Sequence, residues 1–198
     1  MAIWTCRHAQ ADVEGICYGR SNVPLKLTAA PAAELVVERL GDAKMQAIWA
    51  SPLARARDLA EEVAHRLGIP VQVDARLSEI DFGLWEGLPF SEIERRDHAR
   101  FVRWQAEWEF LPAPGGESLH QMQDRVEAWY KGRQSELDGA NVLVVSHAGV
   151  IRALRAHVLG TLFEDELRSD VPHLVPECLD ANRVALGSVR RISAKPFV

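Results

Sequence analysis

The chain has 198 residues, of which 47% are hydrophobic, and a formal net charge of -5 from 28 acidic residues against 23 Lys and Arg. These values fit one globular domain over residues 1–198 and exclude a disordered chain or a disulfide-dense scaffold. The acidic balance argues against a nucleic-acid partner. Because the chain has no run of about 18 apolar residues and no secretory hydrophobic segment, we expect no membrane partner and a cytoplasmic location.

The cysteine and metal-ligand patterns predict neither a disulfide nor a metal site. Cys6, Cys17 and Cys178 are odd in number and lack C-x-x-C spacing, which favours reduced, buried thiols. Glu61 and His65 stand four residues apart, as metal ligands can, but no third ligand is spaced to join them. We therefore expect no metal and no other cofactor.

Short apolar runs alternate with amphipathic stretches along the chain, which is typical of an α/β domain. We predict a three-layer α/β/α sandwich with a mostly parallel central sheet. Ser51 as N-cap and Pro52 as first residue fit the start of one helix, and Gly68 fits its end. In chain order, the first elements are predicted to be a strand over 3–6, a helix over 31–40, a strand over 47–50, a helix over 54–67 and a strand over 71–73.

A helical insertion is predicted next, within about residues 80–118. Its stretch 90–108 carries tryptophans and phenylalanine among many charges, and a turn rich in Pro and Gly follows over 112–116. We expect it to cover one edge of the sheet as a candidate lid, with its tryptophans packed in the core, or alternatively forming a partner-binding stripe. The remaining elements are predicted to be a strand over 142–145, a helix over 150–159 and a last strand over 184–192.

Cationic and imidazole side chains follow three of the predicted strands. Arg7 and His8 end the first strand, His147 follows the strand over 142–145, and Arg55 falls in the opening turn of the helix after the strand over 47–50. Ligands of open α/β sheets collect at the carboxyl ends of the strands. If these strands are neighbours, two guanidinium groups and two imidazoles form a site suited to a dianionic phosphoryl group.

The ordered motifs around these residues resemble those of the histidine phosphatase (phosphoglycerate mutase-like) superfamily. The resemblance covers roughly residues 1–160, and no single motif carries it alone. The motifs are Arg7-His8, Ser-Pro-Leu-Ala-Arg-Ala over 51–56, Leu-Ser-Glu over 77–79, Phe-Gly-Leu-Trp-Glu-Gly over 82–87, Pro-Gly-Gly-Glu-Ser-Leu over 114–119 and Ser-His-Ala-Gly-Val-Ile-Arg over 146–152.

This resemblance implies a phosphatase mechanism without metal, in which His8 attacks phosphorus and becomes a phosphohistidine that water then cleaves. Arg7, Arg55 and His147 would hold the phosphoryl oxygens. Glu79 would act as general acid and then base, because it follows Leu-Ser where the family keeps its acid. The other carboxylates of the segment are Asp81 and Glu86, and the expected substrate-binding residues are Gly19, Arg20 and Ala148.

A narrower resemblance concerns the substrate, which the implied activity makes a small-molecule phosphate ester. The stretch 12–25 resembles the branch of the family that includes α-ribazole 5'-phosphate phosphatases, although Ala9, Ala11, Glu14 and Asn22 depart from the usual pattern. Two alternatives stay open: a cofactor-dependent phosphoglycerate mutase, which generally has a longer insertion, and an inactive phospholigand-binding module. A homodimer is also left open. We assign no role to the scattered His98, His120, His157 and His173.

Overall fold

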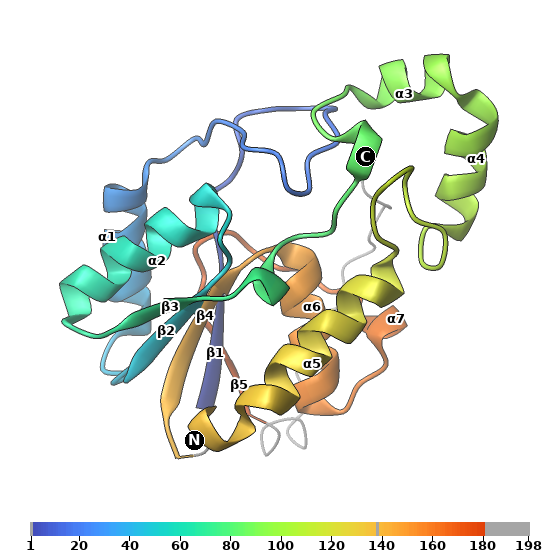
Figure 1. The fold of residues 1–198 in the computed structure, drawn as a ribbon. Coiled ribbons are helices and arrows are strands. Elements are labelled where there is room, and N and C mark those ends of the chain that lie inside the picture. The colour runs from blue at the N-terminus through green and yellow to red at the C-terminus, as the bar shows by residue number, and fades with distance from the viewer. Residues whose placement is uncertain (1, 138, 181–198) are drawn as a thin grey trace.

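A computed structural model describes residues 2–137 and 139–180. Within them, a five-stranded sheet has the order β3-β2-β4-β1-β5 (Figure 1). The first four strands in sequence pair in parallel, and the last is antiparallel to β1, which confirms the mostly parallel α/β sheet. The strands are β1 (Ala2–Arg7), β2 (Ala47–Ala50), β3 (Val71–Val73), β4 (Asn141–Ser146) and β5 (Glu177–Leu179).

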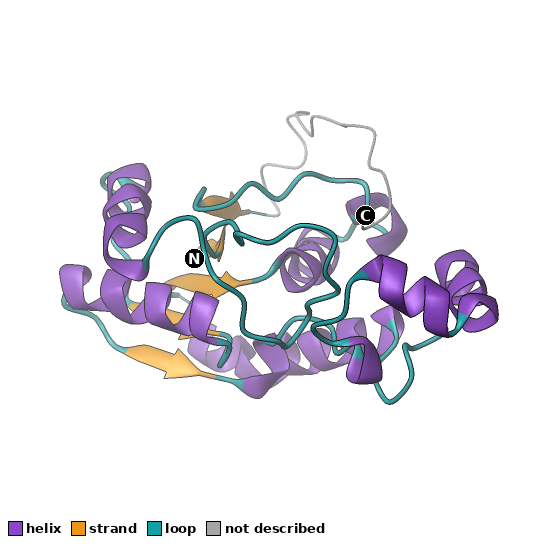
Figure 2. Cartoon of the chain, turned by 90° about the horizontal axis from the view of Figure 1, so that it is seen from above, coloured by secondary structure: helices purple, strands orange, loops and turns teal. Residues whose placement is uncertain are grey.

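Helices cover both faces of this sheet, as the three-layer prediction requires (Figures 1 and 2). Alternating side chains of β4 enter two separate cores: Leu143 and Val145 pack on one side, and Val142 and Val144 on the other. This is the period of two expected for a strand buried on both faces. The first core lies under α1 (Ala29–Leu40) and α2 (Ala54–Leu67), and the second lies under α5 (Leu119–Leu137) and α6 (Ala148–Leu159).

The predicted insertion contains two short helices, α3 (Phe90–Arg96) and α4 (His98–Glu107), which follow the 3-10 turns η1 (Ala75–Leu77) and η2 (Gly83–Trp85). The helices lie beyond the carboxyl ends of the strands (Figure 1). Trp85 and Trp104 are buried, with ring centroids 5.3 Å apart. Edge-to-face aromatic packing therefore joins α4 to η2, as expected for core rather than partner-binding tryptophans.

Some details differ from the sequence-based predictions. The sheet gains the short strand β5, and the helices α5 and α7 (Phe163–Glu166) are not among the predicted elements. The last strand predicted over 184–192 lies outside the described residues. Cys6 and Cys17 are buried thiols as expected, and burial raises the pKa of each to about 12, whereas Cys178 is only half-buried. Among the described helices, none is both long and apolar enough to span a membrane.

Candidate active site

The carboxyl ends of β1, β2 and β4 meet at one edge of the sheet, so the predicted site residues come together. Arg7 at the end of β1 pairs with Ser146 in β4, and Ala50 in β2 pairs with Val145. Loops cross over these strand ends when the molecule is viewed from above (Figure 2). The parallel pairing of these strands therefore brings the site residues together, which the sequence could predict only if the strands were neighbours.

His8 follows β1 and is almost fully buried. Its ring Nδ1 lies 2.6 Å from the Ala9 carbonyl oxygen, and its Nε2 lies 3.2 Å from Arg55 Nε, which is a donor. These partners place the imidazole proton on Nδ1 and leave the lone pair on Nε2. Burial, followed by the charge of Arg55, holds the pKa of His8 well below its ordinary value, so the ring is neutral near pH 7.

Arg55 connects His8 to the loop over 19–21. Its Nη1 donates to the Ser21 carbonyl oxygen at 2.9 Å, and its Nη2 donates to the Gly19 carbonyl oxygen. Arg7 has a different arrangement, because its Nη1 donates to the Val171 carbonyl oxygen at 3.0 Å while its buried Nε has no partner among the described residues. Burial lowers the pKa of both guanidinium groups, as expected for cations held out of water.

His147 lies behind this arrangement, fully buried, with its ring centroid 5.0 Å from that of His8. Its Nε2 is 2.8 Å from Ser51 Oγ, and within the described part of the chain its Nδ1 has no partner. The prediction of Ser51 as N-cap and Pro52 as first helical residue is wrong, because α2 begins at Ala54 with Leu53 as its N-cap. The Ser51 hydroxyl accepts from the Leu53 N–H at 3.2 Å and also contacts the imidazole.

A cavity of about 260 Å³ opens beside His8. Its polar lining comes from Arg7, His8, Arg55 and Glu79, and Ala148 from the start of α6 also contributes. The other lining residues are largely apolar: Gly15, Ile16, Tyr18, Ile80, Phe82 and Phe90. The arrangement combines one imidazole lone pair, two cations and one carboxylate at the mouth of a mainly apolar pocket.

Glu79 is the only one of the three candidate carboxylates among the residues that line this cavity. Its Oε1 accepts from the Ile80 backbone N–H at 3.1 Å, and its Oε2 has a longer contact, 3.4 Å, with the Gly149 N–H. Asp81 instead accepts from the Gly83 N–H at 2.8 Å and pairs with Arg20 at 3.0 Å.

Glu86, the third carboxylate, supports the loop that holds Arg55. It accepts hydrogen bonds from the backbone N–H groups of residues 19–21, from the Ser21 hydroxyl and from the Phe82 N–H. Burial raises the pKa of Glu86, but these donors outweigh it and the net shift is downward. Gly19 and Arg20, expected to bind substrate, are therefore held in this loop and do not line the cavity.

His173, to which the sequence assigns no role, lies beside His8 in the fold. Its Nδ1 lies 2.6 Å from the His8 carbonyl oxygen, and the two ring centroids are 5.6 Å apart. Burial and the charge of Arg7 lower the pKa of His173 to about 4. The contact spans 165 residues in sequence. No local pattern could have shown it, because it depends on the chain returning to β1 before β5.

Comparisons with known proteins agree with this geometry. The family model of the histidine phosphatase superfamily (branch 1) matches residues 3–174. The chain belongs to this superfamily. It is 30% identical over 163 residues to the adenosylcobalamin/alpha-ribazole phosphatase of Escherichia coli K12, covering 81% of this chain and 80% of that protein. It is also 30% identical over 156 residues to phosphoserine phosphatase 1 of Hydrogenobacter thermophilus, covering 78% and 74% of the two chains.

Solved structures give the same result for the fold. The alpha-ribazole phosphatase from Shigella flexneri superposes with a TM-score of 0.84 at 26% identity, covering 98% of this chain and 96% of that one. The histidine phosphatase described here is thus a phosphoric monoester hydrolase by family, with an α-ribazole phosphatase-like fold.

Proposed function

We propose that this histidine phosphatase hydrolyses a small-molecule phosphate monoester, α-ribazole 5'-phosphate, through a phosphohistidine formed on His8. The observation that carries the proposal is the His8 Nε2 lone pair beside a cavity that also holds Arg7, Arg55 and Glu79. A neutral imidazole is nucleophilic, and two guanidinium groups complement the two negative charges of a phosphate monoester.

In the first step, Nε2 attacks phosphorus in line and the bond from phosphorus to the ester oxygen breaks. Glu79 gives its proton to the departing oxygen, so the alcohol leaves neutral. In the second step, Glu79 takes a proton from water as the water attacks the phosphohistidine. The N–P bond then breaks, inorganic phosphate is released, and His8 and Glu79 return to their starting states.

Substrate binding requires one rearrangement. Arg55 Nε donates to the nucleophilic Nε2 of His8, so it must transfer to a phosphoryl oxygen before attack. The exchange is favourable because a hydrogen bond between guanidinium and phosphate joins two charges, whereas the bond to the imidazole joins a cation to a neutral acceptor. Arg7 Nε, without a partner among the described residues, provides a second donor. We also propose that His147, whose buried ring stays neutral and lies 5.0 Å from that of His8, donates a ring N–H to a phosphoryl oxygen.

The lining of the cavity favours α-ribazole 5'-phosphate over phosphoglycerate. The benzimidazole of α-ribazole is flat and apolar, and Ile16, Tyr18, Phe82 and Phe90 offer a matching wall. A mutase substrate has an additional carboxylate, but the lining contains only Arg7 and Arg55 as cationic groups, and both are assigned to the phosphoryl group. Since Phe82 and Phe90 belong to the insertion, we also propose that residues 80–118 act as a lid within a single domain.

Covalent labelling tests the intermediate. Protein mixed with ³²P-labelled substrate and quenched in alkali, where phosphohistidine survives, should retain label. His8→Ala should retain none, because among the described residues that line the cavity His8 supplies the imidazole. The exposed His65→Ala is the matched control and should label like the wild type. If folded His8→Ala protein still retains label, a residue other than His8 is the nucleophile.

Assays with a panel of substrates test the substrate and reaction. In EDTA, α-ribazole 5'-phosphate should release phosphate with a kcat/KM at least about tenfold above that of O-phosphoserine and 3-phosphoglycerate. A higher value for O-phosphoserine would reassign the substrate. Isomerisation of 3-phosphoglycerate stimulated by 2,3-bisphosphoglycerate would identify a mutase. Binding without turnover would identify a binding module, and strict metal dependence would overturn the mechanism.

The leaving group tests the acid. Glu79→Gln should slow hydrolysis of alkyl phosphates about 10²- to 10⁴-fold, because an alkoxide needs a proton as it departs. The same variant should slow p-nitrophenyl phosphate much less, since nitrophenolate leaves without a proton. Steady-state kcat for both substrates gives the comparison. An equal loss on both substrates would remove Glu79 from the acid role.

A further inference from the structure

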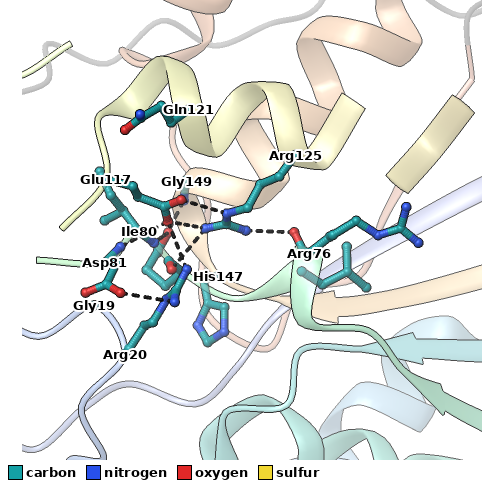
Figure 3. A network of polar contacts seen from close by, with 12 residues as sticks. Gly19, Arg20, Arg76, Ile80, Asp81, Glu117, Gln121, Arg125, His147 and Gly149 are labelled. Atoms are coloured by element: carbon teal, nitrogen blue, oxygen red, sulfur yellow. Dashed lines mark hydrogen bonds and ion pairs between the residues drawn. The ribbon is translucent and has the colours of Figure 1, made fainter. Parts of the chain in front are cut away.

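A buried guanidinium holds the backbone that carries Glu79. Arg125 extends from α5, with only 17% of its side chain exposed. Its Nη1 donates to the Arg76 carbonyl oxygen at 2.7 Å (Figure 3). Its Nη2 donates to the Glu79 carbonyl oxygen at 3.1 Å. One planar group thus connects α5 to both ends of the segment 76–79.

Glu117 fixes the orientation of this guanidinium. Its Oε2 accepts from Arg125 Nε at 3.0 Å, and its Oε1 accepts from Arg125 Nη2 at 2.6 Å. Two parallel charged hydrogen bonds of this kind hold a guanidinium in one plane. Oε1 also accepts from the Asp81 backbone N–H at 3.1 Å. The pair formed by Glu117 and Arg125 therefore anchors the chain on both sides of Glu79, at residues 79 and 81.

The carboxylate itself has few restraints of its own. Its contacts are the N–H of the adjacent Ile80 and the longer contact with Gly149 N–H. Where Glu79 points consequently depends on where its backbone is held. A proton donor must lie within hydrogen-bond reach of the departing oxygen, and a misplacement of about 1 Å can cost about 10² in rate.

We propose that Arg125, oriented by Glu117, is a positioning residue that holds Glu79 for proton transfer. The proposal rests on the acid role of Glu79 proposed above. Arg20 extends the same network, because its guanidinium pairs with Asp81 at 3.0 Å and with Glu117 at 3.4 Å (Figure 3). The loop that holds Arg55 is thus joined to the segment that holds the acid.

The test uses the full chain and separates positioning from general stability. We compare Arg125→Lys, which keeps the charge but loses the planar fork, with Glu117→Gln as a second variant. The matched control is Lys131→Gln on the same helix, because the Lys131 side chain is 63% exposed and pairs with Glu127 of α5 itself. Circular dichroism and thermal unfolding confirm that each variant is folded.

Two substrates are used: p-nitrophenyl phosphate and either α-ribazole 5'-phosphate or O-phosphoserine, whichever alkyl ester the wild type hydrolyses faster. Arg125→Lys and Glu117→Gln should lower kcat on the alkyl ester about 10- to 100-fold, while kcat on p-nitrophenyl phosphate stays within about threefold. Combined with Glu79→Gln, neither should lower kcat further, because both act through that carboxylate. Lys131→Gln should leave the ratio of the two rates unchanged.

Each contrary result has a separate meaning. If Glu79→Gln alone shows no preference between the substrates, the acid role fails and the proposed function needs another acid. If Glu79→Gln shows the preference but Arg125→Lys and Glu117→Gln lower both rates equally, Arg125 is structural and the positioning proposal is overturned. Additive losses in the double variants would overturn it as well.

Discussion

The protonation state of one imidazole governs the proposed chemistry. Burial and the nearby Arg55 both disfavour imidazolium at His8, so its pKa lies well below about 6.5, the value of an unperturbed histidine. The neutral ring is then retained as the pH falls through that value. In an NMR titration of the ligand-free protein, the His8 ring resonances, assigned by their loss in His8→Ala, should show no protonation step near pH 6.5. A step there would contradict the buried, cation-flanked environment.

A second prediction at the residue scale concerns Glu86, which acts as a multiple acceptor rather than as an acid. Its carboxylate holds the backbone of residues 19–21, and that loop in turn supplies both carbonyl partners of Arg55. An amide has only one acceptor oxygen, so Glu86→Gln would face N–H donors with its own NH₂ group.

We expect Glu86→Gln to raise KM for p-nitrophenyl phosphate about tenfold, the loss that corresponds to about 1.4 kcal/mol, because Arg55 loses its anchored partners. Steady-state kinetics give the value. Glu61→Gln, in an exposed carboxylate of α2, is the control and should leave KM unchanged. An unchanged KM for Glu86→Gln would mean that the loop keeps its position without the carboxylate.

At the scale of single elements, two helical glycines make a matched pair. A Cβ added at Gly149 in the first turn of α6 would lie 2.6 Å from Glu79 Oε1 and 3.0 Å from Met122 Sδ. A Cβ added at Gly132 in α5 would meet only Arg76 Nη1, at 3.8 Å. A methyl group is therefore crowded at position 149 in α6 but fits at position 132 in α5.

Gly132→Ala should raise the free energy of unfolding by about 1 kcal/mol through helix propensity and leave kcat unchanged. Gly149→Ala should displace the Glu79 carboxylate and lower kcat more on an alkyl phosphate than on p-nitrophenyl phosphate. Urea unfolding and steady-state assays measure the two effects. Full activity of Gly149→Ala on the alkyl ester would show that the carboxylate can move at little cost.

Local sequence signals explain which elements could be predicted. The helix over 54–67 ends as expected, because Gly68 takes the left-handed conformation that ends a helix. The strands β2 and β3 also match, since short apolar runs with clear breaks define them. In contrast, β5 has three residues and is fixed by pairing with β1, and such a strand has no period of its own.

The site residues also divide into those that local sequence signals predict and those that only the fold brings into contact. Arg7, His8, Arg55 and His147 are expected together because each stands at a strand or helix end, and the family resemblance adds Glu79. Of these, Arg7, His8, Arg55 and Glu79 line the cavity, whereas His147 lies beside the His8 ring. The roles of Ser51 as partner of His147, and of His173 as partner of His8, depend on contacts between distant segments. Those contacts follow from the order of strands in the sheet, which sequence periodicity does not specify.

At the scale of the whole molecule, the fold assembles a site that disfavours additional positive charge. Two guanidinium groups and three imidazoles gather where β1, β2 and β4 end, and burial lowers the pKa of each imidazole. The interior can hold this arrangement because two packed cores fix the strands from both sides. The same buried guanidinium and imidazole groups that suit the site to an anion therefore also make the stability of the fold sensitive to acid.

That sensitivity gives the last prediction. Below about pH 6.5 unfolded histidines bind protons, whereas the folded forms of His8, His147 and His173 do not, so each proton bound lowers the free energy of the unfolded state relative to the folded state. The contribution of these histidines to the free energy of unfolding is therefore fully present above about pH 6.5. It falls as the pH decreases, by up to about 1.4 kcal/mol per pH unit for each histidine. For His173 the window closes near its pKa of about 4.

Urea unfolding of the wild type and of His173→Gln, measured at about pH 7 and about pH 5, tests this coupling. Protonation of carboxylates is common to both proteins, so the difference between their slopes isolates one histidine. Because the variant lacks that proton-binding site, its free energy of unfolding should fall by roughly 1 kcal/mol less per pH unit below about pH 6. Parallel pH dependences would mean that His173 binds a proton as readily in the folded protein as in the unfolded chain. In that case its contact with the His8 carbonyl would have to be made by an imidazolium.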